Sequence, residues 1–134
     1  MNGALIDSNV LLDLFTDDPE WAGWSQTTLE AQGVKGPICI NPVVYAEVSI
    51  GFELIEDLEF ALNGCSLTML SLPKEALFLA GKAFLRYRTA GGSRSAPLPD
   101  FFIGAHAAVA SLTLVTRDRG RFSSYFPSLR IVAP

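Results

Sequence analysis

Short hydrophobic segments alternate along this chain with longer segments in which apolar residues recur every three or four positions. Short apolar runs bounded by turn residues are typical of buried strands, whereas a 3.6-residue apolar period is typical of helices. The predicted strands are residues 4–6, 36–40, 67–72, 113–116 and 129–132. Because strands that alternate with helices usually pair in parallel, we expect an α/β fold, a three-layer α/β/α sandwich with a central, mainly parallel, Rossmann-like sheet.

The helices are predicted from their start signals and their apolar spacing. Asn41 followed by Pro42 is a strong helix start, because Asn caps the first turn and proline fits the first helical position. This start places Glu47 in the second turn. Pro99 opens another helix and places Asp100 in its first turn, where the helix dipole favours a negative charge. The other predicted helices cover residues 10–15, 19–32, 53–62 and 76–87.

Size and composition fit one compact domain. The chain has 134 residues, of which 49% are hydrophobic and 18% charged, and this is too apolar for a disordered protein. We therefore expect residues 1–134 to form a single domain. The longest stretch without an acidic residue, Lys or Arg, 101–116, is shorter than the roughly 20 residues of a membrane-spanning helix. The first residues do not resemble a secretory signal, so a cytoplasmic protein without a membrane segment is expected.

Charge is divided unevenly along the chain, whose net charge is −4. All but three of the 14 acidic residues lie within residues 1–60, whereas all but one of the ten basic residues lie within residues 61–134. A local basic face could hold a few phosphates of a nucleic acid, and solvated helix faces explain the same residues equally well. Asp13 is most simply explained as solvated surface. The candidate nucleic-acid contacts are Arg86, Arg88, Arg94, Arg117 and Arg119.

Four acidic residues occupy positions from which they could meet at one edge of the sheet. Asp7 and Asp118 come at or just beyond the end of a predicted strand, and Glu47 and Asp100 lie in opening turns of predicted helices. Ligand sites gather at the carboxyl ends of strands in open α/β sheets. Two carboxylates about 4 Å apart repel by on the order of 4 kcal/mol at an effective dielectric of 20, so such a cluster needs protons or a cation. Oxygen ligands favour Mg²⁺ or Mn²⁺, and no cluster of His and Cys suggests a softer metal.

The same acidic residues lie in four segments that together resemble PIN-domain ribonucleases, in particular the VapC-type toxins of type II toxin–antitoxin systems. Residues 5–13 (LIDSNVLLD) resemble the opening PIN signature, and residues 41–47 (NPVVYAE) are similar to the family's helix with its next acidic residue. Residues 99–107 (PDFFIGAHA) resemble the third acidic segment of VapC-type toxins, and residues 114–118 (LVTRD) complete the set. The resemblance covers nearly the whole chain, and Ser8 keeps the hydroxyl where many members have Thr.

This resemblance implies a PIN-like fold and an endoribonuclease that uses one or two Mg²⁺ or Mn²⁺ ions to cut single-stranded or loop RNA. The catalytic residues and metal ligands that it implies are Asp7, Glu47, Asp100 and Asp118. The supporting polar groups beside them are Ser8, Asn9 and Thr116. The resemblance also implies a cognate VapB-type antitoxin that inhibits the enzyme, and a homodimer.

Two other functions stay open. A module that binds RNA or a protein without cleaving it could have the same fold and the same carboxylates. A phosphatase with an aspartyl nucleophile would also place this residue after the first strand, at Asp7, but such enzymes usually have a second aspartate two residues later, where this chain has Asn9. His106 lies on an apolar helix and is interpreted as a packed or hydrogen-bonded residue, outside the catalytic set.

Overall fold

The computed structural model describes residues 3–91 and 98–134, so Arg94 lies outside the described residues. The strands in these ranges are β1 (Ala4–Ile6), β2 (Ile38–Ile40), β3 (Thr68–Met69), β4 (Thr113–Val115) and β5 (Ile131–Val132). The helices are α1 (Ser8–Phe15), α2 (Ala22–Lys35), α3 (Pro42–Ser49), α4 (Ile55–Gly64), α5 (Lys74–Thr89), α6 (Leu98–Val109) and α7 (Arg119–Ser123). Each strand and helix predicted from the sequence is present, with ends that differ by a few residues.

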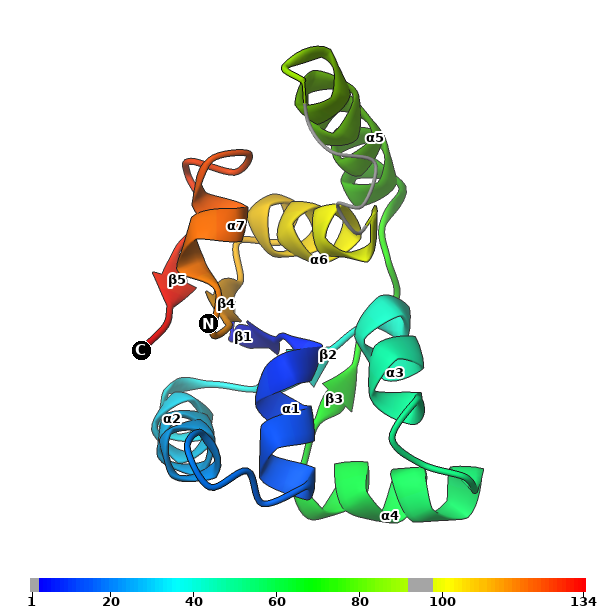
Figure 1. Cartoon of the computed structure of the whole chain (residues 1–134), viewed down its shortest axis with the longest axis vertical. Helices are drawn as coiled ribbons and strands as arrows, with labels where there is room; N and C mark the ends of the chain where they lie inside the picture. The colour runs from blue at the N-terminus through cyan, green and yellow to red at the C-terminus, as the bar shows by residue number, and fades with distance from the viewer. Residues whose placement is uncertain (1–2, 92–97) are drawn as a thin grey trace.

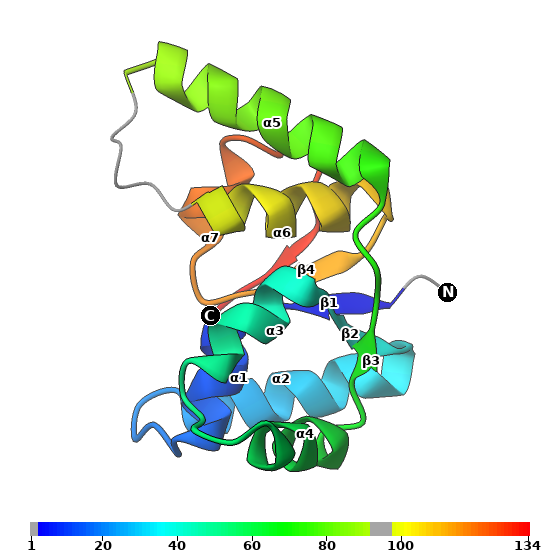
Figure 2. The same ribbon diagram turned by 90° about the vertical axis from the view of Figure 1, so that its right-hand side faces the viewer.

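The five strands form one parallel sheet in the order β3-β2-β1-β4-β5. Strand β1 is central, with Leu5 paired to Cys39 of β2 and Ile6 paired to Val115 of β4. Helices α1, α2 and α4 lie on one side of the sheet, and α6 and α7 lie on the other, with α5 packed outside α6 (Figure 1, Figure 2). The expected three-layer α/β/α sandwich with a parallel sheet is therefore confirmed.

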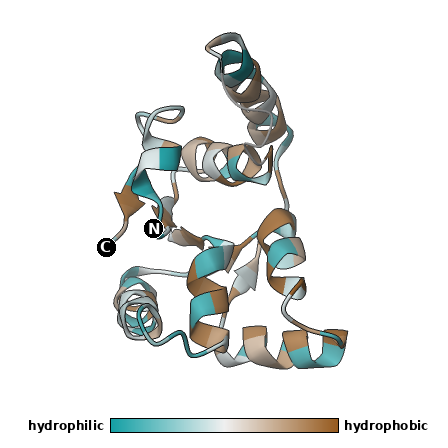
Figure 3. Cartoon of the chain, in the orientation of Figure 1, coloured by the Kyte–Doolittle hydropathy of each residue, from teal (hydrophilic) through white to brown (hydrophobic). Residues whose placement is uncertain are grey.

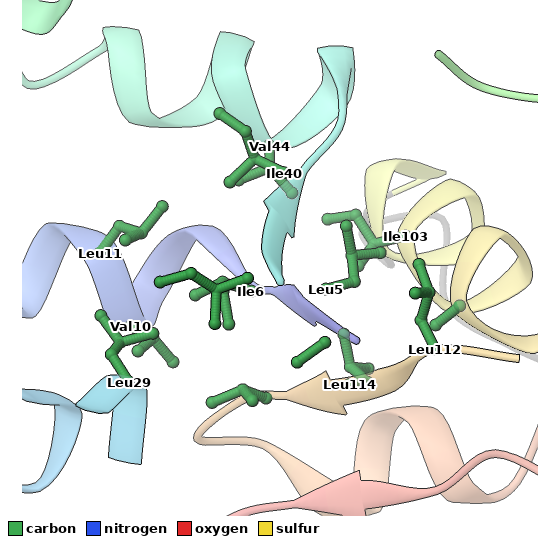
Figure 4. Close-up of a cluster of buried hydrophobic side chains, with 14 of the residues drawn as sticks. Leu5, Ile6, Val10, Leu11, Leu29, Ile40, Val44, Ile103, Leu112 and Leu114 are labelled. Atoms are coloured by element: carbon green, nitrogen blue, oxygen red, sulfur yellow. The ribbon is translucent and has the colours of Figure 1, made fainter. Parts of the chain in front are cut away.

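Alternation along the central strand divides its side chains between the two helical layers. Leu5 and Ile6 are both fully buried, and Figure 4 shows Leu5 beside Ile103 of α6 and Ile6 toward Val10 of α1. Successive residues of a strand point to opposite faces, so a strand covered on both faces is apolar throughout. Polar residues are consequently found just beyond the strand, at its carboxyl end, where Asp7 begins the connection to α1.

A second apolar cluster joins α5, α6 and the segment after α7. The ring centroids of Phe101 in α6 and Tyr125 lie 5.4 Å apart. Gly104 allows the chain after α7 to approach α6 closely, because a Cβ atom built on Gly104 would lie 2.5 Å from a ring carbon of Phe126. The cluster therefore holds α7 against α6, near the carboxyl end of the sheet.

Helix α7 is the element that the sequence pattern does not predict. It has only five residues, which is too short for a recognisable apolar period, and it starts where the Asp118 side chain accepts from the backbone N–H of Arg121 at 3.3 Å. Strand β3 is shorter than the predicted 67–72, because only Thr68 and Met69 pair with β2 at the sheet edge. Across the part of the chain that the structure describes, no helix has the length and apolar character needed to cross a membrane.

Candidate functional site

The carboxyl ends of the three inner strands bring distant parts of the chain together. Asp7 follows β1, and its backbone N–H donates to the carbonyl of Val115, the last residue of β4, at 2.9 Å. Thr116 follows β4, and Asn41 follows β2 as the cap of α3. Asp7, Thr116 and Asn41 are all buried. This edge of the sheet is where parallel α/β proteins bind ligands, so the predicted location of the site is reasonable.

Asp7 is the most deeply placed of the predicted acidic residues, with 4% of its surface exposed. Its Oδ2 atom accepts a hydrogen bond from the Thr116 hydroxyl at 2.7 Å, and its Oδ1 atom accepts from the backbone N–H of Ser8 at 2.8 Å. Burial, with the added charges of Asp100 and Glu47, raises the pKa of Asp7 to about 6, although both hydrogen bonds act in the other direction. A nearby cation would therefore stabilise the ionised form of this residue.

Glu47 reaches the same edge of the sheet from the second turn of α3, as predicted. Its Oε1 atom accepts a hydrogen bond from the Ser8 hydroxyl at 2.9 Å, which links α3 to the first turn of α1. Burial and the charge of Asp100 raise the pKa of Glu47, while the Ser8 hydrogen bond lowers it. The Ser8 hydroxyl thus orients the Glu47 carboxylate, and the supporting role of Ser8 at a metal site stays a prediction.

His106 is buried in α6 and holds the start of α3 through Asn41. The Oδ1 atom of Asn41 accepts from the backbone N–H of Val44 at 2.9 Å, so its Nδ2 group donates to Nδ1 of His106 at 3.1 Å. This contact requires a neutral imidazole with its proton on Nε2, and burial lowers the pKa of His106. His106 is thus packed and hydrogen-bonded, as predicted, and it connects the helices that carry Glu47 and Asp100.

Asp100 and Asp118 are joined by Arg121, a residue that the sequence pattern does not single out. The Nη1 atom of Arg121 lies 2.6 Å from Oδ2 of Asp100, and its Nε atom lies 3.1 Å from Oδ2 of Asp118. The Thr116 hydroxyl, which donates to Asp7, also accepts from the backbone N–H of Asp118 at 3.1 Å. Burial raises the pKa of Asp100, Arg121 opposes the shift, and Asp118 adds to it.

Arg121 thus contacts two of the four carboxylates, and its charge also acts on Asp7 and Glu47. The charge of Asp100 raises the pKa of both Asp7 and Glu47, and the charge of Asp118 raises that of Asp100, so the four groups act on one another. When all are ionised, charges of −4 and +1 leave a sum of −3. As the side chains stand, no three His, Cys, Asp or Glu residues within 3–91 and 98–134 lie close enough together to hold a metal ion. Repulsion between ionised carboxylates keeps them apart, and Asp100 and Asp118 are each paired with Arg121.

The chemistry of these donors fits a hard divalent cation. All four predicted ligands offer carboxylate oxygens, which Mg²⁺ and Mn²⁺ prefer. Among the described residues, the side-chain oxygen of Asn9 is buried and has no hydrogen-bond partner, which leaves a further oxygen acceptor in the first turn of α1. The predicted roles of Asn9 and of the four acidic residues as metal ligands or their supports stay predictions.

Arg117 does not extend toward a solvent-exposed substrate face but pairs with Asp13. Its Nε atom lies 2.6 Å from Oδ2 of Asp13, and its guanidinium lies 5.2 Å from the ring centroid of Trp21. The expectation that Asp13 is solvated surface is wrong, because Asp13 is buried and its partner lies 104 residues away along the chain. Burial raises the pKa of Asp13, and Arg117 opposes that shift.

The other described arginines predicted to contact RNA are spread over two elements. Arg86 of α5 places Nη2 3.5 Å from the carbonyl oxygen of Tyr125, and Arg88 lies over the ring of Phe84, 5.9 Å from its centroid. Arg119 places Nη2 3.4 Å from the carbonyl oxygen of Ile131. An RNA-contacting role for these residues stays a prediction.

Arg121 could have been found only from its position three residues after Asp118, in the opening turn of a helix capped by that aspartate. Among the described residues, Arg121 is the basic residue that forms ion pairs with predicted ligands, and its side chain is half-exposed.

Comparison with known proteins identifies the family and the fold. The sequence model of the PIN domain matches residues 4–125. VapBC2 from Rickettsia felis bound to a promoter DNA fragment is similar with a TM-score of 0.77 and 20% identity over 98% of both chains. A toxin–antitoxin complex from Klebsiella pneumoniae has a TM-score of 0.72 and 24% identity over 98% of both chains. DNA-bound VapBC from Salmonella typhimurium has a TM-score of 0.71 and 20% identity, over 99% of this chain and 98% of that chain. At these identities the likeness establishes the fold, and no curated protein matches the sequence.

Proposed function

This chain belongs to the PIN-domain family, and on that premise we propose that it is a Mg²⁺- or Mn²⁺-dependent endoribonuclease and the toxin of a toxin–antitoxin pair. The observation that carries the proposal is the group of four interacting carboxylates at the carboxyl end of the sheet, with Arg121 as its cationic partner. A group with an excess of three negative charges is suited to hold divalent cations. The resemblance of residues 99–107 to VapC-type toxins favours RNA as the substrate.

The residues that would hold one or two ions, directly or through water, are Asp7, Glu47, Asp100 and Asp118. A bound ion stabilises charge on phosphoryl oxygens and lowers the pKa of water, so that water can attack a phosphodiester. The protein holds the carboxylates of Asp7 and Glu47 in position before an ion binds. Thr116 and the backbone N–H of Ser8 bind the two oxygens of Asp7, and the Ser8 hydroxyl orients Glu47.

Arg121 has a different part in this arrangement. It forms ion pairs with Asp100 and Asp118, and half of its side chain is exposed to solvent. A guanidinium in this position can exchange a carboxylate for a phosphate oxygen, because both offer the same paired acceptor geometry. We therefore assign Arg121 to the RNA phosphate next to the site.

A small VapB-type antitoxin is the proposed partner, and a homodimer is the proposed assembly. Structures of similar fold include toxin–antitoxin complexes. Large apolar side chains lie exposed on α4 and α5, among them Phe60, 82% exposed, and Phe78, 69% exposed, and Figure 3 shows hydrophobic bands along α4. Helices α4 and α5 lie at opposite ends of the molecule (Figure 1), so they offer two separate apolar surfaces to partner chains. Co-expression with the product of the neighbouring reading frame should yield a complex, and light scattering should give its stoichiometry.

Cleavage of an end-labelled single-stranded RNA by the purified protein tests the enzymatic proposal. We expect cutting with Mg²⁺ or Mn²⁺ and none with EDTA. Asp100→Asn should lower the rate by about a thousandfold or more, since an ion at such a site is worth several kcal/mol in the transition state. Asp13→Asn is the matched control, because it makes the same change at a buried aspartate paired with Arg117, and it should retain cutting.

The outcomes separate the alternatives. Equal rates for Asp100→Asn and the wild-type protein would contradict the mechanism. Uptake of Mg²⁺ and binding of RNA without cutting would favour the non-cleaving module. Hydrolysis of a phosphomonoester in place of RNA, abolished by Asp7→Asn, would favour the aspartyl-nucleophile phosphatase.

A further inference from the structure

A pocket opens beside the carboxylates, between α6, α7 and the end of α5. Its volume is about 470 Å³, within the range of small-molecule binding sites. Its lining changes from charged to aromatic and includes Asp100, Asp118, Arg121, Phe101, Tyr87 and Tyr125. The pocket is therefore continuous with the candidate metal site but differs from it in chemistry.

Three rings from three segments form the aromatic part of this lining. The centroid of Tyr125 lies 5.4 Å from that of Tyr87 on α5 and 5.4 Å from that of Phe101 on α6. The ring planes meet at 70° and 60°, so neither pair is stacked face to face. Phe101 is buried behind them, whereas Tyr87 and Tyr125 are only partly buried. The two tyrosines thus present flat apolar surface to the pocket.

Two arginines lie near this aromatic surface, and Arg121 is the one that lines the pocket. Arg121 lies where the rings meet the carboxylates, and the Arg86 guanidinium lies 3.5 Å from the carbonyl oxygen of Tyr125. Gly120 also lines the pocket, and no atom lies within 4 Å of the place where its Cβ would be, so this side is open. A complementary ligand has a flat, weakly polar group beside an anionic group. A nucleotide, with its base and its phosphate, has both.

We propose that this pocket, called the aromatic pocket below, receives one unstacked nucleobase of single-stranded RNA next to the phosphodiester that is cut. The inference rests on the proposed function and adds to it a binding site for the unpaired base beside the cut. Bases in single strands stack on aromatic side chains, whereas bases in a duplex are stacked on one another and do not enter such a pocket. An apolar peptide is a poorer occupant, because it offers no anion to Arg121.

Ring-labelled tyrosine provides a test that does not depend on cleavage. The chain has three tyrosines, and Tyr45 serves as an internal reference because its hydroxyl donates to Glu59 of α4, at 2.7 Å, and its ring does not line the aromatic pocket. The probes are the four nucleoside 5′-monophosphates, which contain no internucleotide bond to cut, with ribose 5-phosphate as the probe that lacks a base. All are added to the wild-type protein with Mg²⁺.

We expect at least one nucleotide to shift the ring resonances of Tyr87 and Tyr125 and to leave Tyr45 unchanged, and ribose 5-phosphate to shift none of them. No shift with any nucleotide, an equal shift of all three tyrosines, or the same shift with ribose 5-phosphate would overturn the proposal. Displacement of a bound nucleotide by an apolar peptide, with tighter binding of that peptide, would also overturn it in favour of a protein ligand.

Substitutions connect the aromatic pocket to RNA cutting. Tyr87→Leu and Tyr125→Leu should each raise the KM for single-stranded RNA by roughly 5- to 150-fold, the range found for loss of one base–aromatic contact. Tyr87→Phe and Tyr125→Phe keep the ring and should remain close to the wild-type protein. Tyr45→Leu, the same change outside the pocket, should leave KM unchanged. The same RNA annealed to its complement should be cut at least about tenfold more slowly, because its bases remain stacked.

The two proposals fail in different ways. If the wild-type protein cuts RNA and both Leu variants cut it with unchanged KM, the aromatic pocket is rejected and the proposed function stands. If no RNA is cut but nucleotides shift Tyr87 and Tyr125, the nuclease proposal is rejected and the pocket remains a nucleotide site. Circular dichroism shows whether the Leu variants are folded. If the Leu variants are unfolded, the KM values of the Phe variants and the resonance shifts of the wild-type protein decide whether the aromatic pocket binds a base.

Discussion

Two buried aspartates six residues apart, Asp7 and Asp13, have opposite electrostatic surroundings. Asp13 faces a guanidinium, because Arg117 lies 2.6 Å from its Oδ2 atom, and the pair sums to zero charge. Asp7 is bound by a hydroxyl and a backbone N–H, and the charges of Asp100 and Glu47 add to the effect of burial on its pKa. Burial is therefore common to both residues. The two aspartates differ in the charges around them. Asp13 and Arg117 form a neutral ion pair, whereas the carboxylates around Asp7 add negative charge, which favours a cation.

The largest difference should appear in stability without metal. The folded pKa of Asp7, about 6, lies above its ordinary value of 3.8, so the folded state holds the proton more tightly and loses stability as the pH rises from about 4 to 6. Asp7→Asn removes this cost, which amounts to about 3 kcal/mol at pH 7.5. Urea unfolding in EDTA should show a gain approaching that value at pH 7.5 and almost none at pH 4.

Asp13→Asn is the comparison for this measurement. It leaves Arg117 without its partner, so it should show no gain of that size at pH 7.5. An Asp7→Asn protein that is less stable than the wild-type protein at pH 7.5, or one whose gain persists at pH 4, would remove the electrostatic distinction between the two aspartates.

Metal binding should give the next largest effect. Mg²⁺ or Mn²⁺ at a hundred times its dissociation constant should raise the free energy of unfolding by about 2.7 kcal/mol, because the ion binds only the folded chain. Scanning calorimetry should detect this gain in the wild-type protein and in Asp13→Asn, and a much smaller gain in Asp100→Asn. If neither ion stabilises the wild-type protein, the carboxylates are not a metal site.

A smaller effect should distinguish the two arginines. Arg121 contacts two predicted ligands, and a unit charge about 6 Å from a divalent ion in a water-like dielectric costs about 1.4 kcal/mol, a tenfold change in affinity. Arg121→Gln should therefore bind Mn²⁺ about tenfold more tightly in isothermal titration calorimetry. Arg117→Gln should match the wild-type affinity, and weaker binding by Arg121→Gln would mean that Arg121 supports the ion and does not compete with it.

Most elements of the fold could be predicted because their signals are local. The apolar residues of β1 and β4 are buried on both faces, and Asn41 with Pro42 begins α3 as expected. Strand order and ion pairs depend on contacts between distant residues, which no local pattern contains. Asp13 and Arg117 show this, since neither segment gives a sign that the two side chains meet.

The site could be predicted only in part for the same reason. Asp7 and Asp118 are recognisable by their places beyond apolar strands, and the parallel pairing of β1 with β2 and β4 places them at the same edge of the sheet as Glu47 and Asp100. Arg121 was missed because the helix that carries it is five residues long. Nor could the aromatic pocket be foreseen, because its rings come from three separate segments of the chain.

The order in which the acidic residues occur along the chain has a consequence for the cell that makes the protein. During synthesis, Asp7 leaves the ribosome more than a hundred residues before Asp118 and Arg121. Until β4 has added beside β1, Asp7 has neither the Thr116 hydroxyl nor the Val115 carbonyl to hold it. The proposed site therefore cannot be complete before residue 121 has left the ribosome, and a chain interrupted before that point lacks part of it.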